Sequence, residues 1–272
     1  NILVTCRKMK ARVPEPIKNK NNVYVDKLHN VYVTKYYLGK QYNGTHKEIM
    51  SVGSSLAILH KSLECNKIPY NYKARDSIYK ILDEKELDKI CKRILHKKCK
   101  TPFDIIVIKH QRELIKICNF LKTSIDVSNF SKQLIHYDLH PGNIIFSKKK
   151  VNSIIDFNTM RKDLVIYDIA YASFRLSLKS TKNIYLQPQL IKIFVKAYLK
   201  KNKIKKEYLV NFDYFLIKIL YRYVSYLLRL GYFYENDKWS QDIEKFVQFL
   251  HIAYKMRKDI SKIIKSINIT LS

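Results

Sequence analysis

The sequence predicts an α+β fold with a short β-rich N-terminal part and a mostly helical remainder. Strand-forming residues fill Val23–Asp26 and Val31–Thr34, which predicts an N-terminal hairpin. Downstream, apolar residues recur at helical spacing, interrupted by two short apolar runs that predict a second hairpin. The change from strand to helix patterning divides the chain into residues 1–42 and residues 43–272.

Most of the remaining chain is predicted to be helical. The first long helix covers residues 45–63, where Thr45 can cap the helix and Glu48, three residues later, can complete a capping box. Apolar spacing predicts further helices at residues 76–98, 103–122, 188–201, 207–230 and 239–264, with one more starting near Asp168.

The second hairpin brings together residues that are apart in sequence. Its apolar runs are Ile144–Phe146 and Ser153–Ile155, joined by the polar, solvent-facing stretch Ser147–Asn152. Because the chain folds back on itself here, Asn143 before the hairpin and Asp156 after it are expected to face the same site.

Asp138, Asn143 and Asp156 together have the composition of a phosphoryl-transfer site. Such a site needs one carboxylate that orients and deprotonates an attacking hydroxyl. It also needs an amide oxygen and a second carboxylate that hold magnesium against the nucleotide phosphates. The alternative is a buried hairpin whose Asp and Asn residues only cap turns. The joint pattern of the three residues favours phosphoryl transfer.

The loop Ile135–Ile144 differs from that of protein kinases, which have Arg where Tyr137 stands and Gly where Asn158 stands. It resembles the aminoglycoside phosphotransferase and choline kinase family, whose loop reads His-Gly-Asp-Leu-His-Pro-Gly-Asn and whose second motif is Ile-Asp-Phe. The segment Tyr167–Ala170 is similar to that family's Asp-Leu-Ala helix start. Tyr137 departs from the family's Gly. The resemblance implies a protein-kinase-like fold with a partial N-terminal β lobe and a mostly helical C-terminal lobe.

The resemblance extends upstream of the loop. Val13–Ile17 and Lys35–Gly39 look like the back half of the family's N-terminal lobe and its hinge, and Gly53–His60 looks like the first helix of the C-terminal lobe. Residues 1–42 would thus be a remnant of the N-terminal lobe with the hinge, and residues 43–272 the C-terminal lobe. Too few residues precede Val13 to hold the family's phosphate-covering loop, strand Lys and helix Glu. We therefore expect the native chain to extend N-terminally.

The resemblance implies transfer of the γ-phosphoryl group of ATP to a hydroxyl of a small molecule. Asp138 would be the catalytic base, and Asn143 and Asp156 would hold Mg²⁺. The backbone carbonyl of Lys35 and the backbone amide of Tyr37 would bind the adenine. ATP and Mg²⁺ are the expected cofactors, and homoserine-like, sugar-like, choline-like and aminoglycoside-like acceptors all stay open.

A kinase-like protein with weak or no activity is the main alternative. It would serve as a structural or binding component, as spore-coat-associated members of this superfamily do. The missing phosphate loop and the high Lys and Tyr content favour this alternative, whereas the intact set of Asp138, Asn143 and Asp156 favours an enzyme.

The chain of 272 residues carries a formal net charge of +29 and is 47% hydrophobic. Such a charge attracts nucleic acid, anionic surfaces or phosphorylated ligands. The alternative is that the Lys residues are ordinary solvated surface in a Lys-rich chain. No nucleic-acid-binding motif accompanies the charge, so nucleic acid is not the expected partner. A basic protein is also a poor electrostatic match for polycationic aminoglycosides.

The sequence predicts a cytoplasmic protein with no membrane partner. No apolar run is long enough for a membrane helix, and no secretory signal is present. The five cysteines include no Cys-x-x-Cys pair, which favours reduced thiols over disulfides or a zinc site.

Other side chains have two interpretations each. His136 and His140 are expected to shape the loop rather than bind metal, because no second His lies at ligand spacing. Asp168 either orients the catalytic loop or N-caps its own helix. Several C-terminal residues either line an acceptor pocket or belong to the core and surface. They are Arg222, Tyr226, Arg229, Tyr234 and Trp239.

Overall fold

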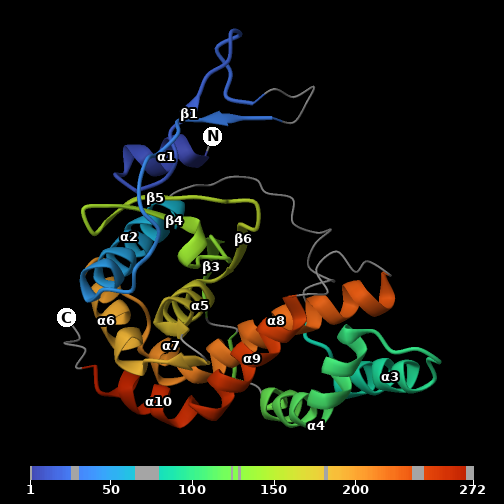
Figure 1. The fold of residues 1–272 in the computed structure, drawn as a ribbon. Helices are drawn as coiled ribbons and strands as arrows, with labels where there is room; N and C mark the ends of the chain where they lie inside the picture. The colour runs from blue at the N-terminus through green and yellow to red at the C-terminus, as the bar shows by residue number, and fades with distance from the viewer. Residues whose placement is uncertain are drawn as a thin grey trace. The chain divides into compact units, whose positions relative to one another are not determined.

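The computed structural model describes residues 2–25, 31–64, 80–123, 125–127, 130–180, 183–234 and 242–267. The chain forms two compact units (Figure 1). The first unit comprises Asn1–Tyr70, Ser131–Val210 and Lys262–Ser272, and the second comprises Asn71–Phe130 and Asn211–Ser261. These units are groups of residues in mutual contact and differ from the two expected lobes, so the lobe boundary expected near residue 42 stays a prediction.

The first unit combines helices with short antiparallel strand pairs. Its helices are α1 (Ile2–Lys8), α2 (His46–Glu64), α5 (Val165–Ser177), α6 (Pro188–Leu199) and α7 (Lys206–Val210). The strand pairs are β1 (Pro16–Ile17) with β2 (Val33–Thr34), β3 (Lys132–Ile135) with β6 (Arg161–Leu164), β4 (Ile144–Ser147) with β5 (Lys150–Ile154), and β7 (Leu178–Ser180) with β8 (Ile184–Leu186).

Helix α2 begins where its sequence predicts. The Thr45 hydroxyl accepts a hydrogen bond from the Glu48 amide at 3.3 Å, and the Glu48 carboxylate accepts one from the Thr45 amide at 3.0 Å. The helix then packs against α5 and α6, with Leu56 fully buried (Figure 1). Gly53 permits the close approach of α6, because a Cβ at this position would lie 2.4 Å from the carbonyl oxygen of Phe194.

The predicted N-terminal hairpin is wrong in its first strand. Strand β2 pairs with β1 rather than with Val23–Asp26. The Asn19 side chain explains the difference, since its Oδ1 accepts hydrogen bonds from the backbone amides of Asn21 at 3.0 Å and Val23 at 3.2 Å. This local bonding forms a turn and competes with a strand ladder. Asp26 itself lies outside the described residues.

The hairpin of β4 and β5 is confirmed, but its connection is shorter than predicted. The strands extend to Ser147 and Lys150, which leaves Lys148 and Lys149 as a two-residue turn. Their φ angles are 50° and 62°, respectively. Two consecutive residues with positive φ are typical of the type I′ turn, whose twist suits a β-hairpin. Strand β5 lies against α2.

The second unit is helical within the described residues. Its helices are α3 (Glu84–Leu95), α4 (Pro102–Lys122), α8 (Phe212–Phe233) and α9 (Asp242–Lys255), and α10 (Arg257–Lys265) runs across the boundary between the two residue ranges. Helix α4 packs against α3, α8 and α9. Its bounds confirm the helix predicted over residues 103–122.

The helix predicted over residues 76–98 starts later than expected. Asp83 accepts a hydrogen bond from the Glu86 amide at 2.8 Å, and the Glu86 side chain accepts one from the Asp83 amide. This capping box fixes the first turn at Glu84. Residues 76–79 lie outside the described part of the chain.

Two long helices predicted near the C-terminus are each divided. The one over residues 207–230 is interrupted at Asn211, between α7 and α8. The one over residues 239–264 is interrupted at Met256, between α9 and α10. The apolar spacing continues across both interruptions, so periodicity alone did not reveal them. Trp239 lies outside the described residues.

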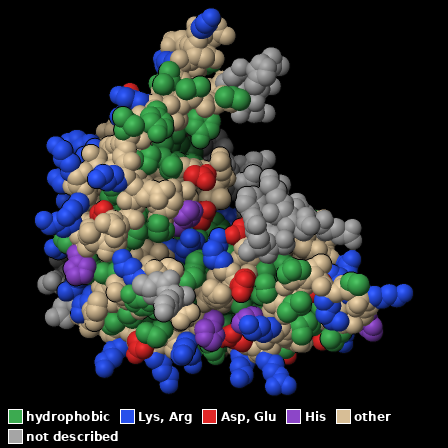
Figure 2. All heavy atoms as spheres, viewed as in Figure 1, with side chains coloured by type: hydrophobic (Ala, Val, Ile, Leu, Met, Phe, Trp, Pro, Cys, Tyr) green, Lys and Arg blue, Asp and Glu red, His purple; other side chains and the backbone are tan. Residues whose placement is uncertain are grey.

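The surface carries many basic side chains. Figure 2 shows Lys and Arg over much of the displayed face, with Asp and Glu between them. None of the helices in the described part of the chain is long and apolar enough to cross a membrane.

Candidate active site

The loop that carries Asp138 is held by the buried carboxylate of Asp168. Asp168 Oδ2 accepts a hydrogen bond from the His136 amide at 2.7 Å, and Oδ1 accepts one from the Tyr137 amide at 2.6 Å. Helix α5 starts at Val165 after Leu164, so Asp168 lies inside the helix and does not cap it. Of the two interpretations of Asp168, loop orientation is the one that its contacts support.

His60 completes the environment of Asp168. Its Nε2 lies 3.0 Å from Asp168 Oδ2 and its Nδ1 lies 2.9 Å from the Tyr198 hydroxyl. The Tyr198 hydroxyl also accepts a hydrogen bond from Asn202 at 3.1 Å. These contacts are all satisfied when His60 carries its proton on Nε2 and Tyr198 donates to Nδ1. A buried carboxylate needs such partners, because losing water is otherwise costly.

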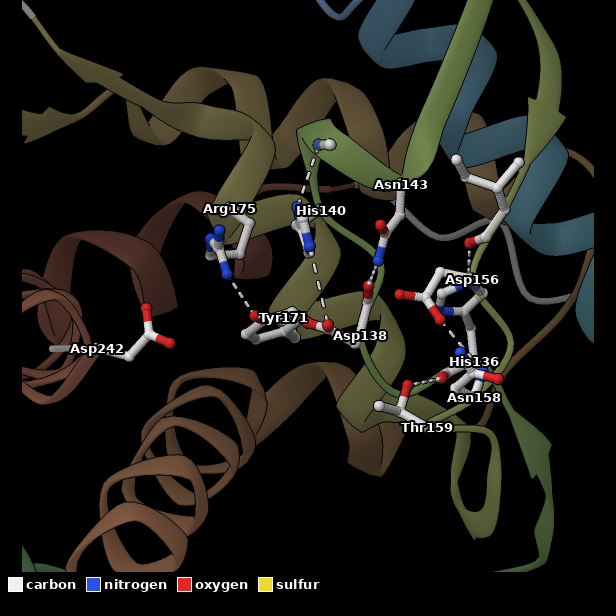
Figure 3. A network of polar contacts seen from close by, with 12 residues as sticks. His136, Asp138, His140, Asn143, Asp156, Asn158, Thr159, Tyr171, Arg175 and Asp242 are labelled. Atoms are coloured by element: carbon white, nitrogen blue, oxygen red, sulfur yellow. Dashed lines mark hydrogen bonds and ion pairs between the residues drawn. The ribbon is translucent and has the colours of Figure 1, made fainter. Parts of the chain in front are cut away.

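Asp138 is half-buried and has polar contacts of its own (Figure 3). The Tyr171 hydroxyl donates to Asp138 Oδ1 at 3.0 Å, and Arg175 donates to the Tyr171 hydroxyl. His140 Nε2 lies 3.8 Å from Asp138 Oδ2. These contacts fix the carboxylate, while its remaining exposed surface can receive a hydroxyl.

Asn143 and Asp156 stand at the open end of the β4–β5 hairpin, as predicted. The Ile155 amide donates to the Asn143 carbonyl at 3.0 Å, which joins the two ends of the hairpin. The Asn143 side-chain amide donates to the Asp138 carbonyl at 2.8 Å. Thus the loop and both ends of the hairpin meet, and Figure 3 draws the three side chains around one region.

The two hairpin residues suit a magnesium ion by their donor chemistry. The side-chain nitrogen of Asn143 makes the contact to Asp138. Among the described residues, no group donates a hydrogen bond to the side-chain oxygen, Oδ1. The Asp156 carboxylate is exposed, and its Oδ1 accepts a long bond, 3.3 Å, from the Asn158 amide. Carboxylate and carboxamide oxygens are the hard ligands that Mg²⁺ prefers.

The backbone around the site departs from ordinary conformations. Tyr137 and Asp156 have φ angles of 75° and 62°, in a region that non-glycine residues seldom occupy. Tyr137 stands where the resembling family has Gly, yet its ring is buried and lies 4.2 Å from the Arg161 guanidinium. The ring of His136 is held in place by its Nε2, which lies 2.9 Å from the Ile155 carbonyl oxygen. Strain of this kind is common at functional sites.

The chain just after the predicted hinge, Lys35–Gly39, lies along strand β4. Lys40 and Phe146 exchange two backbone hydrogen bonds of 2.8 and 2.9 Å. Gly39 allows this approach, since a Cβ would lie 2.5 Å from the Phe146 carbonyl oxygen. Within the described residues, the Lys35 carbonyl and the Tyr37 amide have no backbone partner, so both groups stay available for a ligand.

Sequence reasoning did not identify His60 or Tyr171 as site residues. His60 lies 108 residues before Asp168, so no local spacing links the two. Tyr171 had a weak signal, because it follows Asp168 by three residues on the same helix and therefore lies near the same face. Of the C-terminal pocket candidates, Arg229 is an anchor within the second unit, where it lies 2.9 Å from Glu86.

Comparison with solved structures shows the fold. An aminoglycoside phosphotransferase from Alicyclobacillus acidocaldarius aligns with a TM-score of 0.64 at 14% identity, covering 97% of this chain and 80% of that one. A spectinomycin phosphotransferase bound to AMP aligns with a TM-score of 0.62 at 15% identity, covering 93% of this chain and 82% of that one. A choline/ethanolamine kinase family protein from Mesorhizobium loti aligns with a TM-score of 0.56 at 12% identity, covering 96% of this chain and 79% of that one. The predicted α+β, kinase-like fold is confirmed.

Comparison at the level of sequence identifies the family. No curated protein sequence matches the chain. The sequence model of the phosphotransferase enzyme family matches residues 7–203, which include the loop, the hairpin and Asp168. With this match over most of its length, and with relatives of the same fold, the chain belongs to the phosphotransferase enzyme family.

Proposed function

We propose that the protein transfers the γ-phosphoryl group of ATP to a hydroxyl of a small molecule. The observation that carries the proposal is the meeting of Asp138, Asn143 and Asp156, tied by the 2.8 Å bond from Asn143 to the Asp138 backbone and the 3.0 Å bond across the hairpin end. The family match and the kinase-like relatives support phosphotransfer to small molecules in general. The donor, the acceptor and the residue roles belong to the proposal.

In this mechanism Asp138 orients the acceptor hydroxyl and takes its proton as the hydroxyl oxygen bonds to the γ-phosphorus. The bond from that phosphorus to the β-phosphate oxygen breaks, and ADP leaves. Tyr171 keeps the carboxylate in place through its 3.0 Å hydrogen bond. Asn143 and Asp156 would hold Mg²⁺, which would neutralise charge on the phosphate oxygens. Such a site acts mainly by positioning the reactants and by favourable electrostatics.

The nucleotide is proposed to bind at the hinge. The Lys35 carbonyl can accept a hydrogen bond from the adenine amino group, and the Tyr37 amide can donate one to a ring nitrogen. The AMP found in the spectinomycin phosphotransferase structure supports a nucleotide for this fold. ATP as donor fits the cytoplasmic location that we predict. Positive charge on the protein disfavours polycationic acceptors, so neutral or anionic hydroxyl compounds are the better candidates.

Two measurements test the proposal. The first is calorimetric titration with Mg-ATP. Asp156→Ala is expected to weaken binding about tenfold or more, because it removes a magnesium ligand. The exposed acid Asp259 serves as the charge-matched control, and Asp259→Ala is expected to bind as the unaltered protein does.

The second measurement is a screen of hydroxyl-bearing metabolites scored by ADP release. The proposal predicts acceptor-dependent release for at least one compound class. A protein that neither binds Mg-ATP nor releases ADP with any acceptor would contradict the proposal and favour the inactive kinase-like alternative.

A further inference from the structure

Two helices each carry a row of lysines in the first unit. On α6 these are Lys192, Lys196 and Lys200, which are four residues apart and therefore lie on one face of the helix. On α10 they are Lys262 and Lys265, which are three residues apart and also share a face. Lys192 is half-buried, and the other four are exposed. We call these five lysines the basic face.

The two rows adjoin each other. The Lys192 ammonium donates a hydrogen bond to the Ser266 hydroxyl at 2.8 Å. Ser266 directly follows Lys265, so the end of α10 lies beside α6 within the first unit. Figure 2, drawn in the view of Figure 1, shows Lys and Arg side chains projecting along the edge where α10 runs. The lysines of both helices therefore form one charged surface.

Most of this charge has no ion-pair partner in the described part of the chain. There, no ion pair and no side-chain hydrogen bond reaches four of the five lysines, namely Lys196, Lys200, Lys262 and Lys265. The chain from residue 188 to residue 206 contains seven lysines and no acid. Like charges four residues apart on a helix repel each other. A bound polyanion would relieve this repulsion, and it would release its own counterions on binding.

The side chains around the lysines favour contact through charge alone. None of the large hydrophobic side chains that are exposed in the described part of the chain belongs to α6 or α10. The apolar residues Ile260 and Ile264 of α10 are buried. A helix that inserts into a membrane needs an exposed apolar face, and a site for single strands needs exposed aromatic rings on which bases stack. The basic face has neither.

A nucleic-acid duplex matches the basic face in charge and in spacing. The row from Lys192 to Lys200 is about 12 Å long, at a rise of about 1.5 Å per residue. A DNA duplex carries one phosphate charge for about every 1.7 Å of its axis, so about seven phosphate charges fall within that length. Lysine contacts phosphate as a point charge. Such contacts read no bases, so they need no sequence-reading motif.

We propose that the basic face binds the phosphate backbone of a double-stranded nucleic acid. This binding goes beyond the proposed phosphotransfer and does not depend on it. The lysines of α6 and α10 contact the phosphates through charge, and no base is recognised.

The test is the fluorescence anisotropy of a labelled short DNA duplex, with an RNA duplex of the same sequence as the second probe. The unaltered protein is expected to bind, with an affinity that falls steeply between about 50 and 200 mM salt, because binding releases counterions. The slope of the logarithm of affinity against the logarithm of salt concentration reports the number of phosphates contacted. Comparison of the two probes tells a DNA partner from an RNA partner.

Two double variants locate the contact. Lys196→Gln with Lys200→Gln alters α6, and Lys262→Gln with Lys265→Gln alters α10. Each pair is expected to weaken binding about tenfold or more and to reduce the salt slope by about 1.8, since each lysine contributes about 0.9. All four lysines lie near the C-terminus of a helix, where positive charge also suits the helix dipole, so the melting temperature of each variant is measured too. The second pair keeps the test decisive if the first is unstable.

Lys109→Gln with Lys116→Gln is the matched control. Both lysines are exposed on α4 in the second unit, and the pair changes the net charge by the same amount. The control should keep the affinity and the salt slope of the unaltered protein, because a lysine outside the contact neutralises no phosphate.

Three results would overturn the proposal. They are no binding of either duplex, equal losses of affinity and slope in the control pair and in the α6 and α10 pairs, and binding to phosphatidylserine vesicles without binding to either duplex. The second result would mean that only the net charge matters. The third would assign the basic face to an anionic membrane surface instead.

Discussion

Single residues decide the geometry of the catalytic loop. Asp168 binds two consecutive loop amides and His60 at once, and all of these groups are buried. Tyr137 adopts a positive φ, which costs about 1–2 kcal/mol for a non-glycine residue. Burial of its ring contributes more than that, since removing a buried aromatic ring costs about 3–5 kcal/mol. Packing therefore outweighs strain at this position.

We predict that Tyr171→Phe lowers kcat about tenfold and leaves KM for ATP unchanged. The ring is fully buried and phenylalanine fills the same space, so the variant keeps the packing but loses the donor to Asp138 and the acceptor of Arg175. One lost hydrogen bond to a charged group corresponds to about 1.5 kcal/mol or more. Steady-state kinetics checks this, with thermal melting as the control for folding. An unchanged kcat would mean that Tyr171 does not position the base.

Asp138, Asn143 and Asp156 could be proposed from sequence because they lie within one short segment, where residue type and spacing are both visible. Their proximity is now observed, whereas their chemical roles stay predictions. His60 and Tyr198 could not be proposed. Their partners lie more than 100 residues away, and only the packing of α2 on α5 and α6 brings them together.

At the scale of elements, the two-residue turn of the β4–β5 hairpin has a sequence unsuited to its conformation. Lys148 and Lys149 both adopt positive φ, where Asn-Gly is favoured. We predict that the double change Lys148→Asn and Lys149→Gly raises the free energy of unfolding by about 1 kcal/mol. Urea denaturation measures it. The pair Lys148→Gln and Lys149→Gln removes the same charges without relieving strain, so equal stabilisation by both pairs would refute the conformational explanation.

The N-terminus of α4 gives a pH-dependent prediction. Burial raises the pKa of Asp104, but hydrogen bonds from Tyr232, Thr101 and Lys97 outweigh burial and lower it to about 2. The pKa of an Asp side chain in an unfolded chain is about 3.9. Because the folded pKa is the lower one, Asp104 stabilises the fold above about pH 4, and this contribution is lost as the pH falls towards about 2.

Urea denaturation across this range checks the prediction. Asp104→Asn should be less stable than the unaltered protein at pH 7, and the difference should shrink below about pH 4. Asp88 is a suitable control, because its side chain is 49% exposed and pairs with Lys92 on the same helix. A difference between the Asp104→Asn variant and the unaltered protein that stays constant with pH would contradict the assignment.

Elements were predicted well where a local signal marks their ends. Thr45 with Glu48 marked the start of α2. The β1–β2 pairing was missed because the turn depends on the Asn19 side chain. The interruption at Asn211 was missed because the apolar spacing continues from α7 into α8.

At the scale of the whole molecule, fold class and family followed from the order of motifs along the chain. The helical spacing, the hairpin and the Asp168 segment occur in the order that the family has, and the family match over residues 7–203 agrees with it. The net charge of +29, by contrast, did not identify a partner from sequence. Basic side chains are widespread in Figure 2.

The proposed mechanism depends above all on Asp138 as the base in phosphate transfer. Its most direct test is the rate of transfer of the terminal phosphate of ATP to an acceptor, compared between the unaltered protein and Asp138→Asn. The substitution keeps the size of the side chain, so the melting temperature should hold while the rate falls by at least about a hundredfold. An Asp138→Asn protein that transfers phosphate at the original rate would contradict the account.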